Sequence, residues 1–455
     1  MDIIDQFDSA MQRIVGDAPD GLRLALAYSG GLDSAVLLQL CSAYAARHQI
    51  YLVALHVHHG LSPNADHWVA HCKQRGAELQ VPFEVAHIQM GSTDDDGVEA
   101  TARKKRYAAL GELCAKHQVD VLLTAHHQDD QAETILLQLL RGSGVAGLCG
   151  MQQVHRAAEL LGSDSLLLAR PLLDVPRSAI ENYAAANNIE HIEDESNQDP
   201  RYLRNALRLK IMPELAQYFP GYQNRLARSA LHAQSSLAML EQLAQEDYLH
   251  CLVSPDSGIL DAARLQVLPD ARIDHVLRFW IAAYQRKMPS TARLAEMRRQ
   301  LMTARDDAQV CVRHGDMEVH RYRQQLSIAT CVQEAPSNQP FVWNGEGSMA
   351  FPAFAGSLTI VPAVSAEPGI GRDWLMGRQL EMRRRQGGER LKLAANRPTR
   401  DMKSHYQTLA IPYWQRERLP FIFADRDLVF AAGVGVHGPL LEMGAHCVVL
   451  NWIAD

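Results

Sequence analysis

The sequence lacks the features that would place it in a membrane or around a metal cluster. It has no uninterrupted apolar run of about 18 residues, so we expect no membrane span. Its eight cysteines lie far apart without a CxxC pair, which argues against a zinc ribbon or an iron–sulfur cluster and fits a reducing cytosol. The acidic, amphipathic start at Met1–Asp5 is unlike a secretory or transit peptide. We therefore expect a cytoplasmic protein.

Two common nucleotide-binding motifs are also absent, namely the lysine-containing GxxxxGK[ST] loop and the GxGxxG fingerprint. In their place, Ser29-Gly30-Gly31-Leu32-Asp33-Ser34 joins the apolar run Leu22–Tyr28 to a helical pattern that begins at Ala35. Glycines let the backbone approach an anion, and the first N–H groups of a helix point at it. Two serine hydroxyls add donors, and Asp33 stands where a divalent cation could bridge carboxylate and phosphate. The stretch predicts a phosphate site; an ordinary capped strand–helix turn is the alternative.

Charge and composition describe a soluble globular chain with an unusual distribution of cations. The 455 residues are 47% apolar and 21% charged, which predicts two or three domains with substantial cores. The net charge of −7 is unfavourable for binding nucleic acid. Positive charge is nevertheless gathered at residues 103–106, 201–210 and 378–403. Each cluster could be a solvated face, but together they favour an anionic partner.

Alternating patterns divide the chain into three regions. Residues 1–215 alternate apolar strands with amphipathic helices, which predicts an α/β fold with a doubly wound parallel sheet. Residues 216–335 are predicted to form a helical domain, and 345–455 a small mixed α+β domain after a linker at Cys331–Pro340. The expected strands of the first region are Leu22–Tyr28, Tyr51–Val57, Phe83–Ile88, Val119–Thr124 and Leu166–Arg170. The expected helices of the second are Gln223–Tyr248, Leu260–Val267, Arg272–Arg286 and Thr291–Ala304.

The stretch Thr124–Thr134 places two histidines and several acids where a parallel strand ends. Asp130 and Glu133 have capping-box spacing, with a helix predicted to start near Asp130. Capping alone does not explain the histidines at an edge where parallel sheets bind ligands. Zinc would need further ligands at suitable spacing, so magnesium held by carboxylates and ATP phosphates is the simpler hypothesis. His56 ends another predicted strand. Two roles are equally compatible with it: a contact to nucleotide or RNA, or an ordinary packed or surface histidine.

Six motifs in order make the chain resemble the tRNA(Ile)-lysidine synthase family. They are SGGLDS, HVHHGL, EATARKKRY, TAHHQDDQAET, RGSGVAGLCGM and DESNQDPRYLRN, within the first 215 residues. The match resumes with RRRQGGER at 383–390 and IPYWQR at 411–416, as in the long form of the family. SGGLDS resembles the signature of the N-type ATP pyrophosphatase, or PP-loop, superfamily. Two departures concern tRNA contacts: Ser62 follows HGL, and Lys403 is the one lysine kept before IPYWQR.

The resemblance implies a specific ligation. L-lysine would be joined to C2 of the wobble cytidine in the CAU anticodon of tRNA(Ile), through an adenylated cytidine, with release of AMP and pyrophosphate. The lysidine product changes codon recognition from AUG to AUA and identity from Met to Ile. ATP and Mg²⁺ are the implied cofactors, and a homodimer is left open.

The resemblance also implies roles for individual residues. Asp33, Asp130 and Glu133 would be catalytic, with Asp33 on magnesium. Asp130 and Glu133 would bind lysine or the metal, beside Asp129 and His127. The ATP-binding set is Ser29, Gly30, Gly31, Leu32, Asp33, Ser34 and His56. The tRNA-binding set is Arg103, Arg106, Arg204, Arg208, Arg383, Arg384, Arg385 and Arg390.

Three rival functions were weighed against this one. A tRNA thiolase of the same ATP class would need a persulfide cysteine or CxxC pairs, which are missing. An amidotransferase-type ligase would usually bring an ammonia-generating domain with a nucleophilic cysteine. A non-catalytic RNA-binding module would leave the carboxylates beside SGGLDS without a purpose.

Overall fold

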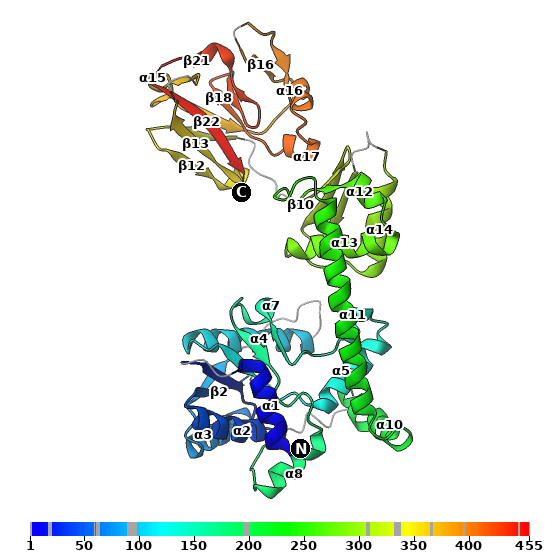
Figure 1. The fold of residues 1–455 in the computed structure, drawn as a ribbon. Helices are drawn as coiled ribbons and strands as arrows, with labels where there is room; N and C mark the ends of the chain where they lie inside the picture. Colours follow the sequence, from blue (N-terminus) through cyan, green and yellow to red (C-terminus); the bar gives the residue numbers. More distant parts are fainter. Residues whose placement is uncertain are drawn as a thin grey trace. The chain divides into compact units, whose positions relative to one another are not determined.

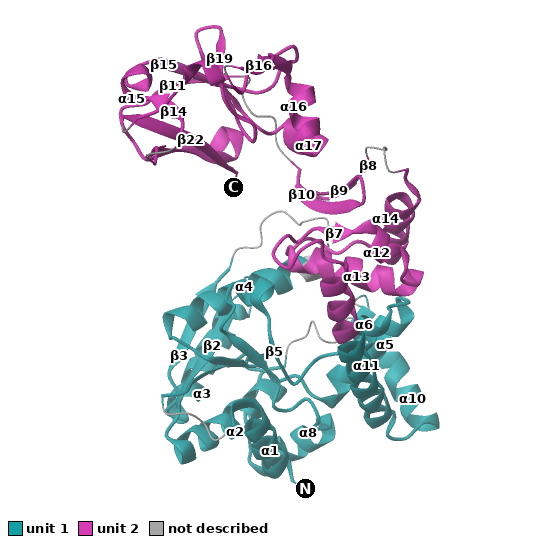
Figure 2. Ribbon diagram, turned by 45° about the horizontal axis from the view of Figure 1, so that its top comes forward, with its two compact units in different colours: residues 1–240 teal, residues 241–455 magenta. Residues whose placement is uncertain are grey.

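The computed structural model describes residues 2–16, 21–58, 60, 64–88, 98–193, 201, 203–305, 310–331, 338–364, 367–394, 396–444 and 446–454. The chain forms two compact units, Met1–Leu240 and Glu241–Asp455 (Figure 2). The predicted domain limits at 215/216 and 335/345 remain predictions. Part of the proposed linker, residues 332–337, lies outside the described residues.

The first unit is built on a six-stranded sheet in the order β3-β2-β1-β4-β6-β5. All neighbours are parallel except β5, which runs antiparallel to β6. The predicted α/β fold class is confirmed, and each of the five expected strands is present; β5 was not predicted. The strands are β1 Arg23–Ala27, β2 Tyr51–His58, β3 Phe83–His87, β4 Val121–Leu123, β5 Val154–Arg156 and β6 Leu167–Ala169.

Helices cover both faces of this sheet (Figure 1). The helices α1 (Ile3–Val15), α2 (Leu32–His48) and α8 (Arg177–Ala186) share one core with residues of β1 such as Leu24 and Leu26. On the other face, α4 (Val98–Lys116) and α7 (Ala158–Leu161) pack on the opposite side chains of the same strands. Alternate side chains of a strand point to opposite faces, so a strand buried on both sides is apolar throughout. The remaining helix of this part, α3 (Ala65–Glu78), packs beside β2 and β3.

A second group of helices lies beyond β4. The helix α5 (Gln128–Leu140) leads into α6 (Val145–Leu148), and Ala132 of α5 packs with Met212 and Tyr222 from later helices. Between α9 (Leu203–Ala206) and α10 (Met212–Tyr218), residues Leu207–Ile211 form a π-helix. Such π segments are rare and frequently occur at functional sites. The long helix α11 (Tyr222–Cys251) follows.

The region from 260 to 331 contains the expected helices and also a sheet that was not predicted. The helices are α12 (Ala262–Gln266), α13 (Asp270–Ala283) and α14 (Thr291–Thr303). The antiparallel sheet has the order β7-β10-β9-β8, from Leu260–Asp261, Gln325–Thr330, Met317–Tyr322 and Val310–His314. The helical prediction for 216–335 was therefore incomplete. In β9, Met317 and Val319 alternate with Glu318 and His320, but the alternation ends at Arg321, and the polar residues are buried as well as the apolar ones.

The last region, 338–454, is a small mixed domain, as predicted. It has two five-stranded sheets around a core that includes Phe351, Leu380 and Ile422, and one hairpin whose Leu391 packs in a second, smaller core. Its short helices are α15 (Arg372–Leu375), α16 (Met402–Thr408) and α17 (Tyr413–Arg416), with 3-10 turns at Pro352–Phe354 and Gly438–Leu440. One sheet contains β11 Asn338–Val342, β15 Gln379–Arg383, β18 Phe421–Ala424, β19 Asp427–Ala431 and β20 Gly435–Val436. The other contains β12 Ser348–Phe351, β13 Gly356–Pro362, β22 Cys447–Ala454, β14 Gly369–Gly371 and β21 Leu441–Glu442, and the hairpin pairs β16 Arg390–Leu391 with β17 Arg400–Asp401.

Among the described residues, no helix combines the length and the apolar character needed to span a bilayer.

Candidate active site

The glycine-rich turn between β1 and α2 has the geometry of an anion site. Gly30 has a positive φ of +88°, and Gly31 is the extended N-cap residue of α2. The Ser34 hydroxyl donates to the Gly31 carbonyl at 2.9 Å and lies 3.1 Å from the Ser29 hydroxyl. Among the described residues, no side chain caps the first turn of α2, so its backbone N–H groups are left for another acceptor.

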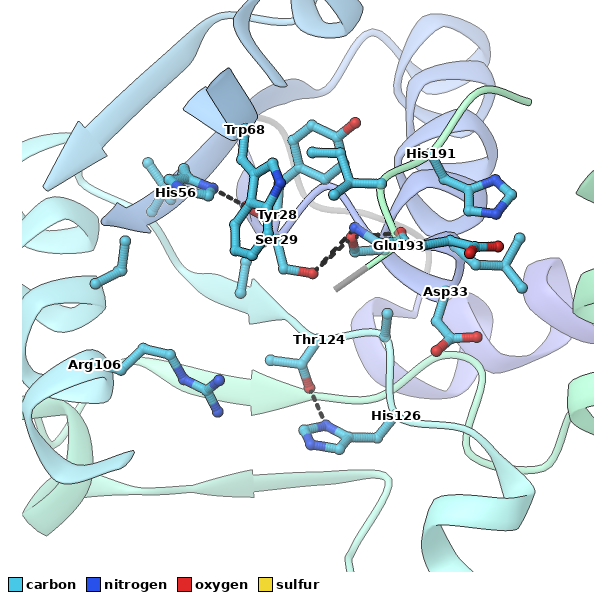
Figure 3. A pocket seen from close by; sticks show the side chains of 18 of the residues that line it. Tyr28, Ser29, Asp33, His56, Trp68, Arg106, Thr124, His126, His191 and Glu193 are labelled. Atoms are coloured by element: carbon cyan, nitrogen blue, oxygen red, sulfur yellow. Dashed lines mark hydrogen bonds between the residues drawn. The ribbon is translucent and has the colours of Figure 1, made fainter. Parts of the chain in front are cut away.

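This turn borders a cavity of about 690 Å³ at the ends of the parallel strands. Figure 3 shows Ser29 and Asp33 on one side and Arg106, Thr124 and His126 on another. The placement agrees with the expectation that ligands bind outside the carboxyl ends of such strands. Among the residues that were predicted, the cavity also contacts Gly31, Leu32, Ser34, His56 and Arg208.

Asp33 has an oxygen that is ready to receive a cation. Its Oδ1 is buried and accepts no hydrogen bond from the part of the chain that the structure describes. An orphaned carboxylate oxygen carries a desolvation penalty, which a bound cation would relieve. One carboxylate together with substrate phosphates is a common way to hold Mg²⁺. The residues present therefore fit a magnesium ion, and Asp33 is the residue that would hold it.

His56 is buried at the end of β2, next to the turn. Its Nδ1 lies 2.8 Å from the Tyr28 carbonyl, and because a carbonyl only accepts, Nδ1 carries the proton. His56 is thus a packed histidine that also lines the cavity. The two readings that its sequence left open are compatible.

The helix α5 starts earlier than expected. The predicted capping box of Asp130 with Glu133 was wrong: His127 is the N-cap and Asp130 is the third helical residue. The Asp130 carboxylate accepts from the His127 backbone N–H at 3.1 Å, and His127 Nδ1 accepts from the Asp130 N–H at 3.4 Å. Helix starts are usually marked in a sequence by serine, threonine, aspartate or asparagine at the cap, and histidine is an unusual cap. The predicted start of α5, near Asp130, was therefore two residues too late.

The cap places His127 among carboxylates. Its Nε2 lies 3.7 Å from Asp33 Oδ2 and 3.4 Å from Asp130 Oδ2, and the side chain is almost completely buried. Burial alone would lower the pKa of His127, but Asp33, Asp130 and Asp129 outweigh it and raise the pKa. Because Nδ1 accepts from the Asp130 N–H, the ring proton is on Nε2, the nitrogen that lies between Asp33 and Asp130.

Asp129 has a different role from its neighbours. Its Oδ2 accepts from the Arg177 backbone N–H at 3.0 Å, and its Oδ1 accepts from Gln223 at 3.2 Å. These contacts fasten the start of α5 to α8 and α11. Asp129 does not line the cavity, and neither do the predicted site residues His127, Asp130, Glu133 and Gly30.

Asp130 and Glu133 are neutralised by two arginines that were expected to meet tRNA. Arg204 and Arg208 both contact Asp130 Oδ1, at 3.1 and 2.8 Å. Their Nε atoms donate to the two oxygens of Glu133, at 2.7 and 2.6 Å, and Glu133 is fully buried. Burial opposes ionisation of Asp130, but His127, Arg204 and Arg208 lower its pKa. The four side chains form one cluster of two acids and two guanidinium groups beside the cavity.

His126 is a cavity residue to which the sequence assigned no role. Its Nδ1 lies 2.9 Å from the Thr124 hydroxyl. The pKa of His126 is lowered to about 3, chiefly by burial. The positive charges of Arg170, Arg204 and Arg103 also lower this pKa, and together with burial they outweigh the negative charge of Asp130, which raises it. His126 is therefore a neutral hydrogen-bonding group. Trp68 and Glu193 also line the cavity, and no pattern in the sequence marked them.

The remaining arginines of the tRNA set are divided between the two units. Arg103 and Arg106 lie on α4, with both guanidinium groups near the Tyr107 ring, and Arg106 reaches the cavity. In the second unit, Arg383 pairs with Glu381 and Arg384 donates to the Glu417 carbonyl at 3.1 Å. Arg385 lies 4.0 Å from Glu389, whereas Arg390 is exposed and contacts the Thr399 carbonyl. Parts of two motifs, including His59, Ser62, residues 194–200 and Tyr202, lie outside the described residues.

Three family models match successive parts of the chain. A PP-loop domain matches residues 4–215, a TilS substrate binding domain matches 260–327, and a TilS substrate C-terminal domain matches 380–452. Curated relatives align along almost the whole length. The tRNA(Ile)-lysidine synthase of Ralstonia nicotianae is 41% identical over 433 residues, which cover 93% of this chain and 91% of the relative. That of Burkholderia pseudomallei is 35% identical over 473 residues, covering 96% and 95%.

Proposed function

The chain belongs to the tRNA(Ile)-lysidine synthase family, and from this premise we propose how its residues carry out the reaction of that family. The enzyme ligates L-lysine to C2 of the wobble cytidine in the CAU anticodon of tRNA(Ile), giving lysidine, AMP and pyrophosphate. Neither step requires a protein nucleophile. Both require alignment of the reactants and neutralisation of charge, which is what a phosphate turn beside an ionic cluster provides.

In the first step, the cytosine C2 oxygen attacks the α-phosphate of ATP, and pyrophosphate leaves. We assign the phosphates to the turn of Ser29, Gly30, Gly31, Leu32 and Ser34, where backbone N–H groups and hydroxyls are available. Mg²⁺, held by Asp33, would supply charge neutralisation for the phosphates. We also assign His56, which supports the turn and lines the cavity, to the adenosine. The wobble base must leave its stack to reach the cavity, at an energetic cost of a few kcal/mol.

In the second step, the ε-amine of lysine attacks C2, and AMP leaves. We assign the amino groups of lysine to Asp130 and Glu133, the two buried acids of the cluster beside the cavity. Because Arg204 and Arg208 already pair with these acids, lysine must take over some of their contacts. The freed guanidinium groups then face AMP or a tRNA phosphate. This exchange keeps every buried charge paired, which a simple addition of lysine would not do.

Holding the rest of the tRNA falls to the later regions in this proposal. The regions matched at 260–327 and 380–452 would read the shape and phosphates of the tRNA body. Arg103, Arg106, Arg383, Arg384, Arg385 and Arg390 would contribute cations. The reduced cysteines and these substrates are consistent with work in the cytoplasm.

The observation that carries the assignment is the Asp33 carboxylate at the glycine-rich turn. Its buried Oδ1 accepts no hydrogen bond from the described residues, and its Oδ2 lies 3.7 Å from His127 Nε2. The test is release of AMP and incorporation of radiolabelled lysine by Asp33→Asn, with varied Mg²⁺. We expect both activities to fall at least a thousandfold. Asp66→Asn is the control, because Asp66 is a fully exposed carboxylate in the same unit. Normal turnover of Asp33→Asn would overturn the assignment.

A further inference from the structure

The IPYWQR segment at 411–416 is one of the motifs that carry the family resemblance, and the indole of its Trp414 is buried against another part of the chain. In the second unit, α17 lies against the strand β9. The Trp414 ring stacks on His320 of that strand, with centroids 4.3 Å apart and planes 12° apart. Trp414 is only 5% exposed and His320 only 2%. A base could not stack on this indole without displacing the histidine.

The polar atoms around His320 complete the contact. A carboxylate only accepts, so His320 Nε2 carries a proton and donates to Glu318 Oε2 at 3.1 Å. Its unprotonated Nδ1 lies 3.1 Å from the Tyr413 hydroxyl, which also lies 3.3 Å from the Val310 carbonyl, so two acceptors share the one hydroxyl proton. Burial lowers the pKa of His320 against the pull of Glu318, and burial raises the pKa of Tyr413 to about 12. Both groups are thus neutral at physiological pH, in agreement with this pattern of donors.

The arginines that follow Trp414 are also engaged within the chain. Arg418 Nη2 donates to Glu318 Oε2 at 3.2 Å and to the Thr330 carbonyl at 2.9 Å. Arg416 donates to the Tyr322 hydroxyl at 3.3 Å and to the Ile411 carbonyl at 2.7 Å. The cations of this segment therefore contact β9, β10 and their own loop.

A metal site is the other reading of this cluster, and the contacts argue against it. Ligand atoms of Cys311, Glu318 and His320 lie within 4.8 Å of one another. Both ring nitrogens of His320 are already hydrogen-bonded, and Glu318 accepts from Arg418 and from Arg313 at 2.9 Å. A cation would face two guanidinium groups and would have to displace a satisfied network.

We propose that the IPYWQR segment is an intramolecular clasp that fastens the C-terminal module (residues 338–454) to the middle module (residues 260–331), so that the two hold tRNA as one body. The stacked ring supplies apolar burial, and the His320–Glu318–Arg418 network gives the contact a fixed geometry. The second half of the proposal, that the joined modules hold tRNA, rests on the proposed function. The clasp itself does not.

Hydrogen exchange of the full-length protein without tRNA tests the clasp. We expect Trp414→Ala to speed exchange at least tenfold in peptides covering 310–322 and 411–418. The control is Trp374→Ala, because Trp374 also lies on a short helix of the C-terminal module but packs into its own core. It should leave exchange at 310–322 unchanged. Unchanged exchange there in Trp414→Ala would overturn the proposal.

A double-mutant cycle separates a clasp from general damage. If Trp414 and His320 act through the same contact, His320→Ala should add less than twofold to the exchange of Trp414→Ala. Independent, multiplicative effects would contradict a shared clasp. Trp414→Phe, which keeps a stacking ring, should restore most of the protection.

A tRNA-binding measurement then tests the functional half. We expect Trp414→Ala to weaken tRNA(Ile) binding about tenfold while the dependence of affinity on salt keeps its slope, because no phosphate contact is lost. A shallower slope for Arg416→Gln, together with unchanged exchange in Trp414→Ala, would show that the segment meets RNA directly. If exchange rises but tRNA affinity does not change, the clasp stands and its role in holding tRNA is wrong.

Discussion

Replacing Gly30 by alanine should damage the phosphate turn far more than the same change at Gly31. A Cβ on Gly30 would lie 2.7 Å from Ile192 Cδ1 and 2.8 Å from Cys72 Sγ, well inside contact distance. The Ile192 backbone is held in place, because its N–H donates to the Gly30 carbonyl at 2.9 Å, so both the Ile192 and the Cys72 side chains would have to rotate to admit the Cβ. Overpacking of this kind costs about 1–3 kcal/mol, and the φ of +88° adds about 1–2 kcal/mol. The total is about 2–5 kcal/mol.

Gly31 provides the matched control. Its φ of −72° suits alanine, and the nearest atom to an added Cβ is Ser29 Oγ at 3.7 Å. Gly31→Ala should therefore change stability by less than about 1 kcal/mol. The assay is urea unfolding of the full chain, followed through the transition that ATP shifts, because that transition reports the unit that binds ATP. Equal midpoints for Gly30→Ala and Gly31→Ala would refute the geometry of the turn.

Other predictions concern the charged groups. Asp130→Asn should raise the KM for lysine at least tenfold more than the KM for ATP, as steady-state kinetics would show; equal changes would remove Asp130 from the lysine site. Glu133→Gln should destabilise the first unit by about 3–5 kcal/mol in urea unfolding, since it leaves Arg204 and Arg208 short of a buried partner; a neutral effect would contradict the cluster. Neutralising the exposed Arg390 should lower the slope of log affinity against log salt concentration for tRNA binding by about 0.9. Neutralising Arg383, which is paired with Glu381, should change this slope less. A larger change for Arg383 than for Arg390 would show that the Arg383–Glu381 ion pair opens when tRNA binds.

The turn at Ser29–Ser34 could be predicted because its signals are local. Glycines, serines and an apolar strand stand within a few residues of one another, and their geometry depends on backbone preferences. The same holds for the five parallel strands, whose double-sided burial makes them continuously apolar in the sequence.

Features that depend on distant partners could not be predicted in this way. Arg204 and Arg208 lie more than seventy positions from Asp130 and Glu133, so their basic run resembled a tRNA contact rather than an ion-pair cluster. The burial of His320 and Glu318 in β9 could not be predicted either, because it depends on contacts with Trp414 and Arg418, about a hundred residues later.

The most direct test of the central claim is the stoichiometry of lysine incorporation. Purified protein, ATP, Mg²⁺ and radiolabelled L-lysine would be incubated with tRNA(Ile) bearing the CAU anticodon, and lysine bound to tRNA and AMP released would be counted together. The account predicts one AMP for each lysine incorporated, with both products lost in Asp33→Asn and retained in Asp66→Asn. Lysine incorporation without AMP release, or undiminished incorporation by Asp33→Asn, would contradict it.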